Sequence, residues 1–170
     1  MDSAEYERKI AHRFAEFDQD GSGYIDRADF TEAAKRLLAE FGTTARSDKG
    51  QALYGGAEAF WQGMAGIADV DGDQQVSREE FVTGAVKRLR DNPHRFAEIA
   101  RPFLHAVVAL ADVDGAGVTP DSAARVLRAL GVDPDKCAVV AAALDADGDG
   151  RIGEEEILAA FAAYYVTPEP

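Results

Sequence analysis

Three short acidic stretches of this sequence space their carboxylates as a divalent-metal site needs them. The most regular stretch covers residues 145–156, with aspartate at positions one, three and five, glycine at six and glutamate at twelve. Calcium takes about six to eight oxygen ligands, and a backbone carbonyl at position seven can add to the carboxylates. The glycine permits the sharp turn that brings the chain around an ion. The predicted ligands are therefore Asp145, Asp147, Asp149, Arg151 through its carbonyl, and Glu156.

The stretch at residues 69–80 has the same oxygens but a different turn. Position six is Gln74, and the left-handed backbone required there costs a non-glycine residue about 1–2 kcal/mol. Carboxylates that face a divalent ion can offset this cost, so the sequence predicts a functional metal loop. Its predicted ligands are Asp69, Asp71, Asp73, Gln75 through its carbonyl, Ser77 and Glu80.

The stretch at residues 18–29 ends in Asp29 where the other two end in glutamate. The aspartate side chain is one methylene shorter and reaches an ion less easily in bidentate mode. We therefore expect weaker calcium binding here, or stronger competition from the smaller Mg²⁺. The predicted ligands are Asp18, Asp20, Ser22, Tyr24 through its carbonyl, Asp26 and Asp29.

A fourth stretch, residues 112–123, keeps the beginning of the pattern and loses its end. Ala116 has no oxygen for position five, Pro120 offers no side-chain ligand at nine, and Ala123 cannot close position twelve. Two aspartates and one carbonyl rarely hold calcium against water, so we expect this loop to bind no metal. In chain order the stretches are named loop 1 (18–29), loop 2 (69–80), loop 3 (112–123) and loop 4 (145–156), and about three ions are expected in total.

Helices are expected to present these loops. Apolar residues recur at helical spacing beside them, as Ile10, Phe14 and Phe17 do before loop 1. Pro102 lies inside the helix predicted over residues 93–111 and is expected to kink or break it. The pattern predicts four helix–loop–helix units grouped in two pairs, over residues 1–91 and 92–170.

Paired loops can satisfy each other's exposed backbone groups. The residue at position eight of each loop is expected to form a short β contact with its partner loop. This contact would give loop 3 a role without metal, because it would support loop 4. The residues expected to form it are Ile25, Val76, Thr119 and Ile152.

The four loops resemble the EF-hand superfamily, in which such a loop lies between two helices. Four hands over the whole chain, unequally spaced, are similar to the sarcoplasmic calcium-binding protein family and more narrowly to its calerythrin-like bacterial members. The resemblance implies an all-α, compact globular protein with two EF-hand pairs packed face to face. It also implies that one hand is commonly inactive.

Composition limits the partners and the location that we expect. A formal net charge of −13 argues against nucleic acid and anionic membranes as partners. No apolar run reaches the length of a transmembrane helix. The charged start of the chain and the single cysteine, Cys137, indicate a protein of the reducing cell interior. We therefore expect a cytoplasmic protein that acts as a monomer.

The residues favour a calcium buffer or transporter over a calcium sensor. Sensor grooves are typically rich in methionine, and this chain has 2 methionines. A sensor that changes conformation and regulates an unidentified target protein is the alternative. Catalysis is not expected, because His12, His94 and His105 are scattered among the predicted helices and no nucleophile–base set has interpretable spacing.

Overall fold

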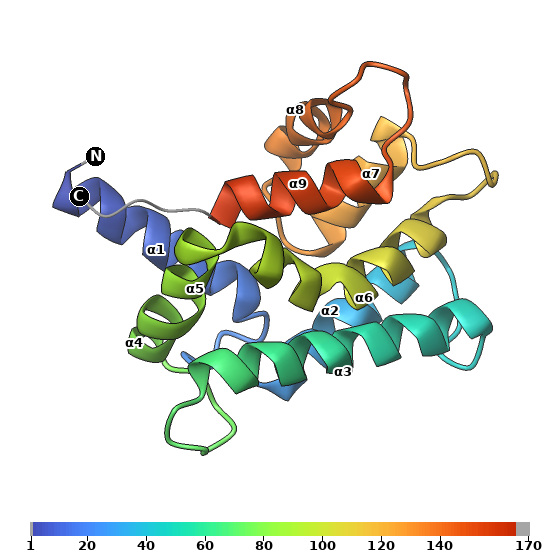
Figure 1. Ribbon diagram of the computed structural model, residues 1–170. Coiled ribbons are helices and arrows are strands. Elements are labelled where there is room, and N and C mark those ends of the chain that lie inside the picture. Colours follow the sequence, from blue (N-terminus) through green and yellow to red (C-terminus); the bar gives the residue numbers. More distant parts are fainter. Residues whose placement is uncertain (1, 166–170) are drawn as a thin grey trace.

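Helices dominate the computed structural model, which describes residues 2–165 (Figure 1). Within that part no extended sheet occurs, so the prediction of a compact all-α fold is confirmed. The first helices are α1 (Ser3–Phe17), α2 (Arg27–Glu40), α3 (Asp48–Ala68), α4 (Arg78–Glu80), the π-helical segment η1 (Phe81–Val86) and α5 (Lys87–Asp91). They are followed by α6 (Pro93–Ala111), α7 (Pro120–Ala129), α8 (Pro134–Leu144) and α9 (Glu154–Tyr165).

Short polar side chains start the helices that follow loops 1, 2 and 3. Asp26 caps α2 and Ser77 caps α4. In both cases the last residue of the loop, Asp29 or Glu80, accepts a hydrogen bond from the backbone N–H of the cap, which completes a capping box. Thr119 caps α7. Helix initiation therefore restricts the same loop positions that metal binding would use.

One β-bridge joins loops 1 and 2, and another joins loops 3 and 4. Ile25 and Val76 exchange two backbone hydrogen bonds of 2.9 and 2.7 Å. The second bridge pairs Ile152 with Val118, so the prediction of Thr119 at this contact is wrong. The apolar Val118 is buried in the bridge, whereas the hydroxyl of Thr119 is used to cap α7. Loop 3 thus reaches its bridge one residue earlier than the other loops.

Pro102 was expected to kink or break its helix; the break does not occur, and the kink stays a prediction. α6 continues through Pro102 from Pro93 to Ala111, although proline lacks the N–H that would bond to the preceding turn. α3 lies against α6, and the two long helices run side by side in Figure 1. Gly56 of α3 allows the close approach, because a Cβ at this residue would stand 2.7 Å from the Phe103 Cα.

A π-helical segment, η1, follows loop 2. Gly84 of η1 lies against Ala68, the last residue of α3. A Cβ on this glycine would stand 2.7 Å from the Ala68 Cα. The two helices that flank loop 2 therefore approach each other through a residue without a side chain.

The main hydrophobic core is aromatic and extends over both predicted units. Its rings come from α1, α2, α3, η1, α6 and α9, so helices on both sides of residue 92 contribute to it. The ring centroid of Phe60, on α3, lies 5.0–6.2 Å from the ring centroids of Phe17, Phe30, Phe103 and Phe161.

A smaller apolar cluster lies beneath loops 3 and 4. The buried members of this second cluster are Ala111, Val118, Ala123, Ala141 and Ile152.

The boundary expected between residues 91 and 92 stays a prediction. Residues 166–170 of the second unit lie outside the described part of the chain.

Candidate metal centres

Loop 4 turns through backbone hydrogen bonds to its own aspartates. The Gly150 N–H donates to Asp145 Oδ2 at 2.8 Å, and the Asp149 N–H donates to Asp147 Oδ1 at 3.1 Å. Gly150 has a φ of 80°, in the left-handed region that glycine adopts without steric cost. The backbone thus orients two of the predicted ligands and leaves further carboxylate oxygens for a cation.

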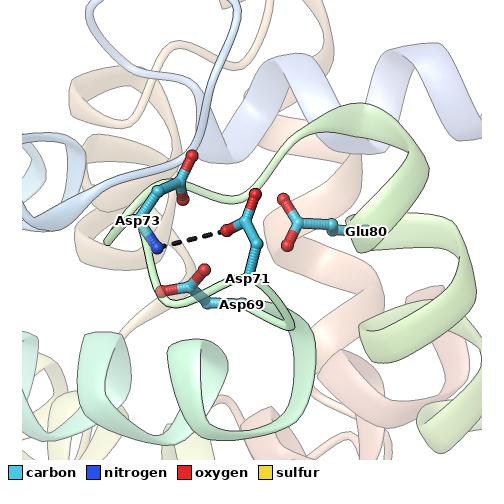
Figure 2. A group of neighbouring side chains, drawn as sticks. All are labelled: Asp69, Asp71, Asp73 and Glu80. Carbon is cyan, nitrogen blue, oxygen red and sulfur yellow. Dashed lines mark hydrogen bonds between the residues drawn. The ribbon is translucent and has the colours of Figure 1, made fainter.

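Loop 2 makes the same turn at a residue that is not glycine. Gln74 has a φ of 63° and is the one non-glycine residue with positive φ in the described part of the chain. Its N–H donates to Asp69 Oδ2 at 2.9 Å, and the Asp73 N–H donates to Asp71 Oδ1 at 3.1 Å. Figure 2 shows these three aspartates and Glu80 grouped within the curve of the loop. The predicted left-handed backbone is confirmed.

A glutamate closes loops 2 and 4 in the same manner. Glu80 accepts hydrogen bonds from the backbone N–H groups at positions two and nine of its loop, at 2.9 and 3.1 Å. Glu156 accepts the equivalent pair in loop 4, at 2.8 and 3.0 Å. Each glutamate therefore reaches back from the following helix to the beginning of its loop, as a bidentate calcium ligand must.

Asp29, the last residue of loop 1, reaches back less far along its loop than the glutamates of loops 2 and 4 do. It is 1% exposed, and it accepts hydrogen bonds from the Asp20 N–H at 3.1 Å and the Asp26 N–H at 2.9 Å. Burial raises the pKa of Asp29 to about 7, against the effect of these two donors. Its carboxylate thus reaches position three of the loop, where the glutamates reach position two. Ser22 and Tyr24 are also brought together, since the Ser22 hydroxyl donates to the Tyr24 carbonyl at 3.0 Å.

Loops 1, 2 and 4 each gather acidic side chains closely enough for one ion. In each loop, one oxygen from every member lies within 4.8 Å of the others. Such a set of hard oxygen donors fits Ca²⁺ or Mg²⁺. The groups are Asp18, Asp20 and Asp29 in loop 1; Asp69, Asp71, Asp73 and Glu80 in loop 2; and Asp145, Asp147, Asp149 and Glu156 in loop 4.

The other predicted ligands lie on these same three loops, and their contact with a metal stays a prediction. Two of them also cap helices, as described above. The set consists of Ser22, Tyr24, Asp26, Gln75, Ser77 and Arg151.

Loop 3 has the turn of its relatives without their final ligands. The Gly117 N–H donates to Asp112 Oδ1 at 3.1 Å, as the equivalent groups do in the other loops. Because the bridge comes one residue early, Ser122 occupies the place that was assigned to Ala123. Ser122 is the third residue of α7, the place that Asp29 and Glu80 take in their helices. The sequence signal that could have revealed this register was an apolar residue directly before the helix cap Thr119.

The remaining residues with reactive side chains are dispersed. His12, His94 and His105 are exposed, whereas Trp61 lies in the core at 2% exposure. Over residues 2–165, no helix combines the length and the apolar character needed to cross a membrane.

Known proteins share these features at the level of sequence. A family model described as an EF-hand domain pair matches residues 7–86, and one described as an EF hand matches residues 142–162. These regions contain loops 1, 2 and 4, the loops with carboxylate clusters. Calerythrin from Saccharopolyspora erythraea is 25% identical over 159 residues, which cover 92% of this chain and 90% of calerythrin.

Solved structures show the same fold. A calcium-binding protein from Streptomyces coelicolor is 67% identical and superposes with a TM-score of 0.93, over 96% of this chain and 99% of that protein. A sarcoplasmic calcium-binding protein from amphioxus, 20% identical, superposes with a TM-score of 0.66 over 97% of this chain and 91% of that protein. The chain therefore belongs to the EF-hand family of calcium-binding proteins, alongside calerythrin and the other bacterial members.

Proposed function

We propose that this protein binds three calcium ions, one in each of loops 1, 2 and 4. The three carboxylate clusters carry this proposal, because like charges held so close repel one another unless a cation joins them. The proposed ligands of loop 1 are Asp18, Asp20, Ser22, Tyr24, Asp26 and Asp29. Those of loop 2 are Asp69, Asp71, Asp73, Gln75, Ser77 and Glu80, and those of loop 4 are Asp145, Asp147, Asp149, Arg151 and Glu156.

Bound calcium would supply positive charge to an acidic chain. Three divalent ions bring six positive charges to a formal net charge of −13, which leaves −7. A ligand that binds the native state and not the unfolded chain adds its binding free energy to stability. Calcium is therefore expected to stabilise the fold strongly, with Mg²⁺ competing chiefly at loop 1.

Titration calorimetry tests the stoichiometry. The wild-type chain should bind three ions, and Asp18→Asn, Asp69→Asn and Asp145→Asn should each weaken one of them selectively. Asp135→Asn serves as the matched control, because Asp135 is an exposed aspartate on α8, outside the loops. A wild-type stoichiometry of two or four ions would contradict the proposal.

We propose a calcium buffer or transporter that acts in the cytoplasm as a monomer, and the packing of the interior supports a buffer over a sensor. Met64 is fully buried, and the aromatic rings around Phe60 form one core that joins α1, α2, α3, α6 and α9. A tightly packed aromatic interior has less freedom to open than a methionine-rich groove. Calcium would then be captured with little rearrangement of the helices.

Calcium-dependent regulation of a target protein is the second candidate. The structure of the 67% identical Streptomyces coelicolor protein is described as a basis for prokaryotic calcium-mediated regulation. Fluorescence of a hydrophobic dye, measured with calcium and with chelator, separates the two roles. A large rise on adding calcium favours the sensor, because apolar surface would become exposed, and little change favours the buffer.

A further inference from the structure

The guanidinium group of Arg151, a residue of loop 4, contacts the oxygens of loop 3. Its Nη1 donates to Asp114 Oδ1 at 3.2 Å and to the Gly117 carbonyl oxygen at 3.1 Å. Its Nη2 donates to Asp114 Oδ2 at 3.1 Å. One cationic side chain therefore contacts both a carboxylate and a backbone carbonyl of the neighbouring loop.

Loop 3 also leaves room for this side chain. Gly117 has a φ of 106°, and a Cβ at this residue would stand 3.2 Å from the Arg151 Cβ and 3.5 Å from its Cγ. A larger residue would thus press on the aliphatic part of the arginine. The planar fork of a guanidinium matches the two oxygens of a carboxylate, which a single ammonium group cannot do.

The third-position aspartates show what is different about loop 3. In loops 2 and 4, Asp71 and Asp147 lie among other carboxylates. Asp114 instead faces Arg151, and the Ala116 N–H together with this guanidinium holds the pKa of Asp114 below its ordinary value. Loop 3 has lost the ligands needed for calcium, yet its aspartate has a positive partner from within the chain.

We propose that Arg151 is the resident cation of loop 3 and holds this loop in its turned conformation whether or not calcium is present. Arg151 is thus a positioning residue for the loop pair. The next residue, Ile152, donates its N–H to the Val118 carbonyl at 2.7 Å, so the side chain and the β-bridge act on the same short segment.

The two loop pairs are then expected to differ when calcium is removed. The residues at position seven of loops 1 and 2 are Tyr24 and Gln75, which carry no positive charge. Repulsion among carboxylates should loosen the bridge between Ile25 and Val76. The bridge at Ile152 should stay ordered, because Arg151 continues to hold loop 3.

Hydrogen exchange measured by NMR on the full chain, with calcium chelated, tests this inference. In the wild-type protein the amides of Gly117 and Ile152 should exchange more slowly than that of Ile25. Arg151→Gln should speed their exchange by about fivefold, as expected for an exposed but bidentate pair. Arg151→Lys should have a smaller effect, and Asp114→Asn should reproduce the effect of Arg151→Gln.

Arg27→Gln is the matched control, because Arg27 forms an exposed ion pair with Glu58 and belongs to the first loop pair. This variant should leave exchange at Gly117 unchanged. Equal exchange at Ile152 in the wild type, Arg151→Gln and Asp114→Asn would overturn the inference, as would a loop 3 that becomes protected only after calcium is added. The measurement is made without calcium, so its outcome does not depend on the number of ions bound elsewhere.

Discussion

Loops 3 and 4 are joined by one β-bridge but differ in the positive charge that their acidic side chains face or could bind. Both make the same turn, in which the glycine N–H at position six donates to the first aspartate. Loop 4 then gathers four acidic side chains, whereas loop 3 places Asp114 against the guanidinium of Arg151. Backbone hydrogen bonds set the turn, and the later side chains decide which cation the turn can hold. The shape of such a loop and its capacity for metal are therefore separable.

The largest effect is expected when the last predicted ligand of loop 4 is removed, because loop 4 should then lose its calcium affinity as loop 3 has. Glu156→Gln should lower the calcium affinity of loop 4 by about 100-fold or more, since even groups beyond the ligand shell contribute about 10–100-fold to metal affinity. Calorimetry checks this loss. Glu155→Gln is the control, because Glu155 pairs with Arg101 outside the cluster. Equal calcium binding by the two variants would contradict the role of Glu156.

Truncation of the side chain of Val118, which forms the bridge between loops 3 and 4, should lower the stability of the fold. Val118→Ala removes two methyl groups from a residue that is 2% exposed, and it should lower the free energy of unfolding by about 2 kcal/mol. Val113→Ala, in the same loop, should have almost no effect because Val113 is 72% exposed. Urea unfolding monitored by circular dichroism measures both. Similar losses in the two variants would show that the bridge has no special place in the core.

A change at position twelve of loop 1 tests how the length of the last predicted ligand affects metal preference. Asp29→Glu should raise the preference of this loop for calcium over Mg²⁺ by about tenfold, because the longer side chain reaches the ion in bidentate mode. Competition calorimetry with the two metals checks the change. If the competition stays as in the wild type, the shorter reach of Asp29 does not set the selectivity.

The smallest effect is expected in loop 3 itself. Asp112→Ala should leave the number of bound calcium ions unchanged, because Ala116 and Pro120 offer no side-chain oxygen at positions five and nine and no carboxylate closes this loop. The same titration used for the other variants provides the measurement. One fewer ion in this variant would mean that loop 3 binds metal after all.

The carboxylate clusters could be predicted because ligand chemistry dictates residue type at fixed positions. The carboxylate clusters of loops 1, 2 and 4 and the left-handed backbone at Gln74 all followed from that rule. The bridge partner in loop 3 did not, since a count of twelve positions assigned Thr119 to a place that Val118 takes. The burial of an apolar side chain and the capping of α7 decided that register.

The sequence by itself determined which loops can gather oxygens, because those oxygens lie within twelve consecutive residues. Only the tertiary structure decided how the loops support one another. The place of Arg151 in loop 3 depends on contacts between residues 34–37 positions apart in the sequence. A local pattern cannot report such contacts, because packing of whole helices determines which side chains meet. For the same reason, the cation assigned to loop 3 comes from loop 4.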